Sequence, residues 1–392
     1  MDDHRNPMER TISDLHEPRT QCYIHHRIAD QVISRSVDIG STIKSLHGLL
    51  SQIGKDQSTE LFDLYVPLFN EIKNKDEVWL GLNLIFPSKT DLVLPIVGSI
   101  KCYVLTFHGD PIDNTWINSS IERLLKHKGK SFLNNVIICC NGERPDNLIS
   151  DIKYHRIEHL HLLPRFYGQP QNHLARKAEV RNHKFSFLSH RDIWFRTALF
   201  MCIYEMGGIY SFTQKPDFSD KQLLDFLKHN GLSHKINDVL DRLPLPLDNY
   251  YEDSINLNDA WSVNNIAYQD CLVNVVNEST MPFEGHMSEK TFKPFISKTL
   301  PIFNSIKQIN RLREFGFAIN DSIYNDISDP ILFQVNALKK LIDIPKKQLI
   351  DLVNEHSQHN RDWFFKGFNE EVNKQNSVAM SNLIQDVKNI VD

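Results

Sequence analysis

Residues 271–319 have the sequence CLVNVVNESTMPFEGHMSEKTFKPFISKTLPIFNSIKQINRLREFGFAI. Its first segment, residues 271–276, is an apolar run bounded by polar residues, which is typical of a strand buried on both faces. A polar loop follows, and Ser288 then begins a segment whose apolar residues recur at spacings of three and four. This spacing predicts a helix with one apolar face.

The second half of the stretch repeats the pattern. Residues 300–303 predict another short apolar strand, and residues 305–315 a second helix that Gly316 ends. Residues 317–319 predict the start of a third strand. Strand, helix, strand, helix and strand in this order are typical of half of a nucleotide-binding parallel sheet.

The first turn of the helix that follows Ser288 carries Glu289 and Lys290. A helix N-terminus has unpaired N–H groups and a partial positive charge, so it favours a phosphate, and Lys290 adds a full positive charge. The Glu289 carboxylate can accept two hydrogen bonds from a ribose diol. Spacing alone equally allows an ordinary amphipathic helix with a solvated Glu-Lys pair.

Four short motifs in this half of the chain resemble the donor-binding half of the fucosyltransferase-like and phage-type glycosyltransferases. These enzymes have the two-domain architecture called GT-B. The resemblance covers roughly residues 183–330 and does not extend to the first 180 residues. Its motifs are Asn277-Glu278-Ser279, the run from Met287 to Pro294, Leu300-Pro301-Ile302-Phe303, and the run from Leu312 to Phe317.

The resemblance implies roles for individual residues. Glu289 would bind the nucleotide ribose and Lys290 a donor phosphate. An arginine just before or inside an earlier helix would contact the diphosphate, and here it matches Arg191 or Arg196. Glu278 and Ser288 complete the candidate donor-binding residues.

That earlier helix is expected to follow a strand at residues 185–188. Ser189 is expected to cap it, and Gly207-Gly208 to end it before a strand at residues 209–212. Arg191 would then lie at a helix N-terminus, where a cation is unfavourable unless an anion is also present. Arg196 would lie a turn later, where it could instead be a solvated helix residue, so we rank Arg191 above Arg196.

The first half of the chain predicts a second α/β lobe after a mostly helical N-terminal region, in which residues 28–50 show a loose helical pattern. A helix is expected at residues 119–127. The expected strands are residues 78–84, 92–96, 101–107, 136–140 and 160–163.

Three residues follow the ends of these strands and are candidates for a catalytic base: His108, Asp110 and Glu143. Carboxyl ends of parallel strands line ligand crevices, and an inverting sugar transfer needs a base near the acceptor hydroxyl. Asp110 is preferred because Gly109 beside it lets the backbone approach a ligand closely. All three also suit ordinary turn positions, and the resemblance does not choose among them.

The expected fold class is therefore α/β, with two Rossmann-like lobes in a GT-B-like arrangement, a helical N-terminal region and C-terminal helices. We expect the helical region at residues 1–75, the acceptor-side lobe at 76–180, the donor lobe at 181–345 and the C-terminal helices at 346–392.

Composition indicates a globular protein: 41% of the residues are hydrophobic and 24% are charged. The N-terminus lacks a secretory signal, no apolar run approaches the length of a membrane span, and the six cysteines form no CxxC pair, so a cytoplasmic location is expected.

The formal net charge is −5, although residues 151–191 carry eight Lys or Arg against three Asp or Glu. This basic segment is either a solvated surface or part of a cleft for an anionic ligand.

These observations predict a glycosyltransferase that moves a sugar from a nucleotide-sugar to an acceptor hydroxyl, by an inverting reaction without a bound metal or other cofactor. The acceptor would be a glycan or, as in phage-type relatives, a modified DNA base. The alternative is a catalytically inactive nucleotide- or nucleic-acid-binding module with the same fold.

Overall fold

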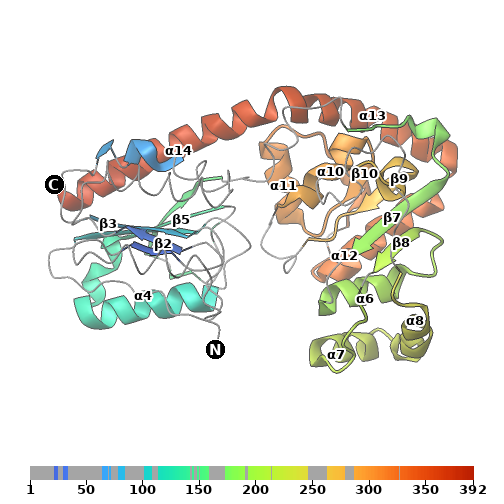
Figure 1. Cartoon of the computed structure of the whole chain (residues 1–392), viewed down its shortest axis with the longest axis horizontal. Coiled ribbons are helices and arrows are strands. Elements are labelled where there is room, and N and C mark those ends of the chain that lie inside the picture. The colour runs from blue at the N-terminus through green and yellow to red at the C-terminus, as the bar shows by residue number, and fades with distance from the viewer. Residues whose placement is uncertain are drawn as a thin grey trace, which may run out of the picture. The chain divides into compact units, whose positions relative to one another are not determined.

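The computed structural model describes residues 22–24, 30–33, 64–68, 70–71, 78–83, 101–107, 114–141, 144, 148–149, 151–158, 173–189, 193–212, 214–245, 263–278, 287–325 and 327–392. The chain forms two compact units (Figure 1). Unit 1 comprises Met1–His161 and Val372–Asp392, and unit 2 comprises Leu162–Glu371. Both contain parallel strands and helices, so the α/β class is confirmed. None of the described helices combines the length and apolarity that crossing a bilayer requires.

Unit 2 is built on a four-stranded parallel sheet. Its strands are β7 (His183–Ser189), β8 (Ile209–Phe212), β9 (Cys271–Val275) and β10 (Leu300–Ile302), in the spatial order β10-β9-β7-β8. Every residue of β9 is buried, as expected for a strand covered on both faces.

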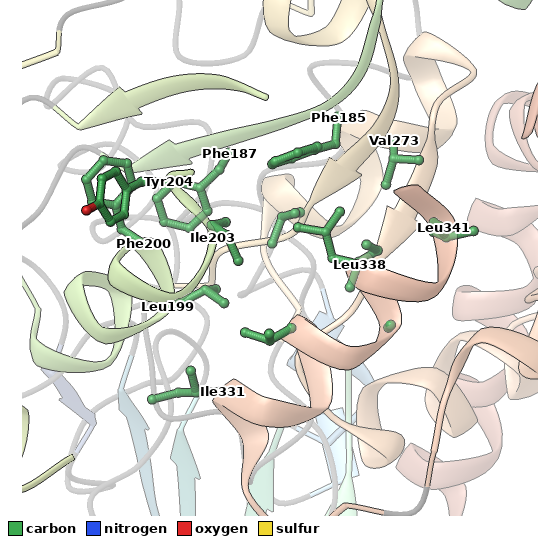
Figure 2. Close-up of a cluster of buried hydrophobic side chains, with 14 of the residues drawn as sticks. Phe185, Phe187, Leu199, Phe200, Ile203, Tyr204, Val273, Ile331, Leu338 and Leu341 are labelled. Atoms are coloured by element: carbon green, nitrogen blue, oxygen red, sulfur yellow. The ribbon is translucent and has the colours of Figure 1, made fainter. Parts of the chain in front are cut away.

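Helices cover both faces of this sheet. The described helices of unit 2 are α6 (Trp194–Ile203), α7 (Lys221–His229), α8 (Ile236–Arg242), α9 (Ile266–Gln269), α10 (Glu289–Ser297), α11 (Ile306–Glu314), α12 (Pro330–Asp343) and α13 (Lys346–Lys366), of which α7 packs on α6. Figure 2 shows Phe185, Phe187 and Val273 of the strands packed toward α6 and α12. A second apolar cluster joins Phe292 and Phe295 of α10 to Phe317, Phe364 and Phe368.

The third strand expected at residues 317–319 is not formed, and that prediction is wrong. The backbone of Ala318 pairs instead with one side chain of α13: its N–H donates to Asn360 Oδ1 at 2.8 Å, and its carbonyl accepts from Asn360 Nδ2 at 2.8 Å. Phe317 stacks on Phe295 at a ring-centroid distance of 4.5 Å. The amide of Asn360 thus supplies the partners that a neighbouring strand would have supplied.

The helix after β7 also begins later than expected. Ser189 does not cap it, because Ser189 is the last residue of β7 and pairs with Phe212 of β8. The helix α6 begins at Trp194 with Ile193 as its N-cap, and it ends at Ile203. Arg191 lies outside the described residues.

Unit 1 is built on a six-stranded sheet in the order β1-β2-β3-β4-β5-β6. The strands β3 (Val78–Asn83), β4 (Cys102–Phe107), β5 (Val136–Cys140) and β6 (Lys153–Arg156) are parallel, and β1 (Cys22–Ile24) and β2 (Asp30–Ile33) are antiparallel.

The structure confirms the strands expected at residues 78–84, 101–107 and 136–140, whereas those at 92–96 and 160–163 lie outside the described residues. The helical pattern assigned to residues 28–50 is wrong where β2 forms. Strand β6 was not anticipated, because its sequence KYHR is polar and each of its residues is only half-buried. Its backbone pairing with β5 decides its structure.

Helices pack on both faces of this sheet (Figure 1). The helix α4 (Asn114–Lys128) buries Ile121 and Leu124 against Tyr103 and Leu105 of β4. The helix α14 (Phe368–Val391) begins in unit 2 and continues into unit 1. There the side chain of Asn376 bonds both backbone groups of Glu158, with distances of 2.7 Å to the N–H and 2.8 Å to the carbonyl.

Candidate functional site

The strand order of unit 2 creates a topological switch point between β7 and β9. From β7 the chain moves to β8 on one side, and it later returns to β9 on the other side. Ligands of open parallel α/β sheets bind outside the carboxyl ends of the strands at such a point. The residues that follow β7 and β9 are therefore the first place to look for a site.

The helix that follows β9 brings Glu289 and Lys290 to this edge of the sheet. The helix begins after Ser288, as the sequence predicted, and Ser288 is its N-cap, accepting a hydrogen bond from the Lys290 N–H at 3.2 Å. The Glu289 carboxylate and the Lys290 ammonium are 3.5 Å apart. Their side chains are 16% and 29% exposed, so both are partly accessible from solvent.

The electrostatics of this turn keep Glu289 ionised. Burial raises the pKa of Glu289, but the positive charges of Lys290 and Lys293 and hydrogen bonds at the helix start more than offset it, and the pKa lies below its usual value. An ionised carboxylate accepts hydrogen bonds and donates none. Glu289 is therefore suited to hydroxyl donors such as a ribose diol.

Lys293 was not among the residues selected from the sequence. It is 8% exposed, and its ammonium lies 5.8 Å from the centre of the Tyr268 ring, a cation–π contact. The signal was present, since a Glu and a Lys four residues apart lie on one face of a helix. Lys293 brings a second positive charge to the first two turns of α10.

Glu278 lies beneath the turn instead of facing a ligand. It is 1% exposed, and its Oε1 accepts from the Ser288 N–H at 3.2 Å and from the Thr291 hydroxyl at 2.5 Å. Its Oε2 accepts from the Ser288 hydroxyl at 2.5 Å. Glu278 and Ser288 thus position the first turn of α10, and neither is included in the ligand contacts proposed below.

The same network reaches the next helix. Gln308 of α11 donates to the Thr291 hydroxyl at 2.8 Å, and its side-chain oxygen accepts from the Asn304 N–H at 3.2 Å. Because these contacts tie the start of α11 to α10, the backbone around Glu289 is held on two sides. Such support is what a preorganised site requires.

Arg196 is also fixed by the protein. It is 2% exposed, and its guanidinium donates to the carbonyls of Glu278, at 2.7 and 3.0 Å, and of Asn277, at 3.2 Å. These carbonyls satisfy the guanidinium, which the resemblance expected to contact a donor diphosphate. Arg196 therefore positions the chain after β9 and is likewise left out of the proposed ligand contacts.

The candidate bases His108, Asp110 and Glu143 lie outside the described residues. The structure ends β4 at Phe107 and β5 at Cys140, so each candidate follows the carboxyl end of a parallel strand within a few residues, as expected. Within the described ranges, no group of three or more His, Cys, Asp and Glu side chains could hold a metal ion.

Comparisons with known proteins return no relative: no protein-family model, no curated protein and no solved structure matches the chain.

Proposed function

We propose that unit 2 binds a nucleotide-sugar and that the protein is a glycosyltransferase with two nucleotide-fold lobes. The observation that carries the proposal is the partly exposed pair of Glu289 and Lys290 in the first turn of α10, at the switch point of a parallel sheet. Ribose and diphosphate are common to nucleoside diphosphate sugars, and this turn offers one group suited to each.

In the proposed mechanism Glu289 accepts hydrogen bonds from the ribose diol. Lys290 and the N–H groups at the start of α10 bind the diphosphate. As the bond between the sugar and the diphosphate breaks, negative charge grows on the leaving group, and these positive groups stabilise it. Lys293 adds to the positive potential from the next turn of the helix.

A base must take the proton of the acceptor hydroxyl if the transfer inverts the anomeric carbon. His108, Asp110 and Glu143 of unit 1 remain the candidates, with Asp110 first. In this proposal the positive side chains of the protein neutralise the diphosphate, and no bound metal ion takes part. The acceptor is a glycan or a modified nucleic-acid base.

The proposal is tested by titrating the full chain with UDP, GDP, ADP and CDP in a calorimeter, and by following nucleotide release from the corresponding sugars. Glu289→Ala should weaken binding of the preferred nucleotide by about 1.5–3 kcal/mol, because hydrogen bonds to a charged acceptor are lost. Lys290→Ala should weaken binding and also slow sugar transfer, because Lys290 acts on both the bound and the departing diphosphate.

Two variants serve as controls. Lys347→Ala removes an exposed lysine from the first turn of α13, and Glu355→Gln an exposed carboxylate from the same helix. Both should bind nucleotide as the parent does. If Glu289→Ala and Lys290→Ala bind nucleotide as tightly as the parent, the two residues are not nucleotide contacts and the proposal is wrong. Nucleotide binding without any sugar transfer or hydrolysis would favour the inactive binding module.

A further inference from the structure

A cavity of about 430 Å³ lies in unit 1 between the carboxyl end of β6 and the part of α14 that belongs to the same unit. We call it the β6–α14 groove. Its volume lies within the range usual for small-molecule sites, about 300–1,000 Å³. None of the sequence motifs pointed to it, because β6 was not anticipated.

One face of α14 lines the groove with Gln375, Val378, Ala379 and Asn382. Counted from Gln375, the other three residues lie three, four and seven positions further on, so all four lie on one side of the helix. The amides of Gln375 and Asn382 are two turns apart, about 10 Å along the helix axis. Each amide can donate and accept hydrogen bonds, which suits hydroxyl groups.

Arg156 supplies planar donors from the opposite wall. Its Nη2 lies 3.5 Å from the Gln375 side-chain oxygen, and its Nε lies 3.5 Å from Glu158 Oε1. Both contacts are at the long limit of hydrogen bonding, whereas good N–H···O bonds are near 2.9 Å. The guanidinium thus places planar N–H donors at the wall of the groove that faces α14.

Val378 gives the groove an apolar surface between the two amides. It is 60% exposed, and it is among the few large hydrophobic side chains of the described residues that are left to solvent. A ligand with both an apolar C–H face and a rim of hydroxyls would cover Val378 while it bonded Gln375 and Asn382. Sugar rings have this combination.

The charges of the groove are nearly balanced. Glu158 is 3% exposed and neutralises Arg156. His155 lies 3.0 Å from Asp386. Burial nevertheless lowers the pKa of His155, so its ring is neutral at pH 7. Lys374 is exposed and already interacts with another group of the protein. This balance disfavours a phosphate or a polyanion, which would require several uncompensated cations.

We propose that the β6–α14 groove binds a neutral, hydroxyl-rich ligand of the carbohydrate class. The argument uses unit 1 alone, so it stands apart from the nucleotide site of α10. Where the glycosyltransferase proposal also holds, the groove favours a glycan over a nucleic acid as the acceptor.

The test is a binding assay on the full chain with neutral oligosaccharides of glucose, galactose, mannose, fucose and N-acetylglucosamine. Inorganic phosphate and a short DNA duplex are tested in the same assay as the competing ligand classes. At least one neutral oligosaccharide should bind, and Gln375→Ala and Asn382→Ala should each lower its affinity about tenfold, the effect of losing one good hydrogen bond. Val378→Ala should lower it a few-fold.

Matched controls lie on the same helix. Gln385 and Asn389 are exposed amides that bond each other at 2.9 Å and do not line the groove. Gln385→Ala and Asn389→Ala should bind the oligosaccharide as the parent does. The proposal is overturned if no neutral oligosaccharide binds, if phosphate or DNA binds in preference, or if Gln375→Ala and Asn382→Ala behave like the controls. Nucleotide titration of the same samples reports on α10 separately, so the two proposals fail independently.

Discussion

Two carboxylates meet the first turn of α10 and have different tasks. Glu278 is 1% exposed and accepts three hydrogen bonds from Ser288 and Thr291, whereas Glu289 keeps part of its side chain in solvent beside Lys290. The inner carboxylate fixes the turn, and the outer one is the ligand contact that we propose. This division separates stability from binding at the scale of single side chains.

Glu278→Ala should therefore lower the free energy of unfolding of unit 2. The change leaves the Ser288 N–H and two hydroxyls without their acceptor, and a single buried unsatisfied donor costs about 1–3 kcal/mol. Denaturant unfolding and hydrogen exchange of the α10 amides measure the effect. Glu289→Ala is the comparison, because it leaves no buried donor without an acceptor and should therefore cost less than Glu278→Ala. Equal stability of the two variants would contradict the division of tasks.

At the scale of elements, the side chain of Asn360 bonds the backbone of a segment that was expected to be a strand, residues 317–319. Asn360 of α13 is 2% exposed and bonds both backbone groups of Ala318. It thereby joins the segment after α11 to the helix that also packs on α10. One amide thus holds together two elements that no sheet connects.

Asn360→Ala should destabilise unit 2 by at least about 1–3 kcal/mol, because a buried N–H and a buried carbonyl lose their partner together. Asn360→Asp keeps the acceptor but sets a carboxylate oxygen against the Ala318 carbonyl in a buried position, so its cost should be at least as large. Asn354→Ala is the matched control: Asn354 lies on the same helix, and its bond to Glu179 is exposed to solvent. If thermal unfolding shows the same loss of stability in Asn354→Ala and Asn360→Ala, the Asn360 amide is not what holds the backbone of Ala318 in place.

At the scale of the whole molecule, α14 is one uninterrupted helix that begins in unit 2 and ends in unit 1. Within unit 1, Asp386 of α14 contacts Lys153 at 2.5 Å and His155 at 3.0 Å, both on β6. These contacts join the end of the chain to a strand more than 200 residues earlier. Their strength should depend on pH.

Burial lowers the pKa of His155, although its bond to Asp386 partly opposes that shift. The unfolded chain, with a pKa near 6.5, therefore binds a proton at a higher pH than the folded protein does. His155 destabilises the folded state as pH falls below about 6.5. The melting temperature of unit 1 should fall between pH 7.5 and pH 5.5, and by less in His155→Gln. An identical fall in both proteins would exclude His155 as a source.

Local sequence was sufficient for several features of this protein. The apolar runs at 136–140 and 271–276 predicted β5 and β9, and Ser288 predicted the start of α10, which in turn located Glu289 and Lys290. These features depend on residues within one or two turns of each other. Side-chain periodicity and capping hydrogen bonds act over that range, so they can be recognised in the sequence alone.

Tertiary structure decided the rest. Glu278 and Arg196 were expected to face a ligand, and each is held by atoms that lie 10 to 82 residues away along the chain. Strand β6 forms because its backbone pairs with that of β5. Residues 317–319 do not form a strand because the Asn360 side chain takes the backbone hydrogen bonds of Ala318. A buried polar group bonds to whichever partner the fold brings near it, and that partner cannot be read from the residues next to it in the sequence. Local pattern therefore determined which turn carries the candidate site, and packing determined which of its side chains remain available to a ligand.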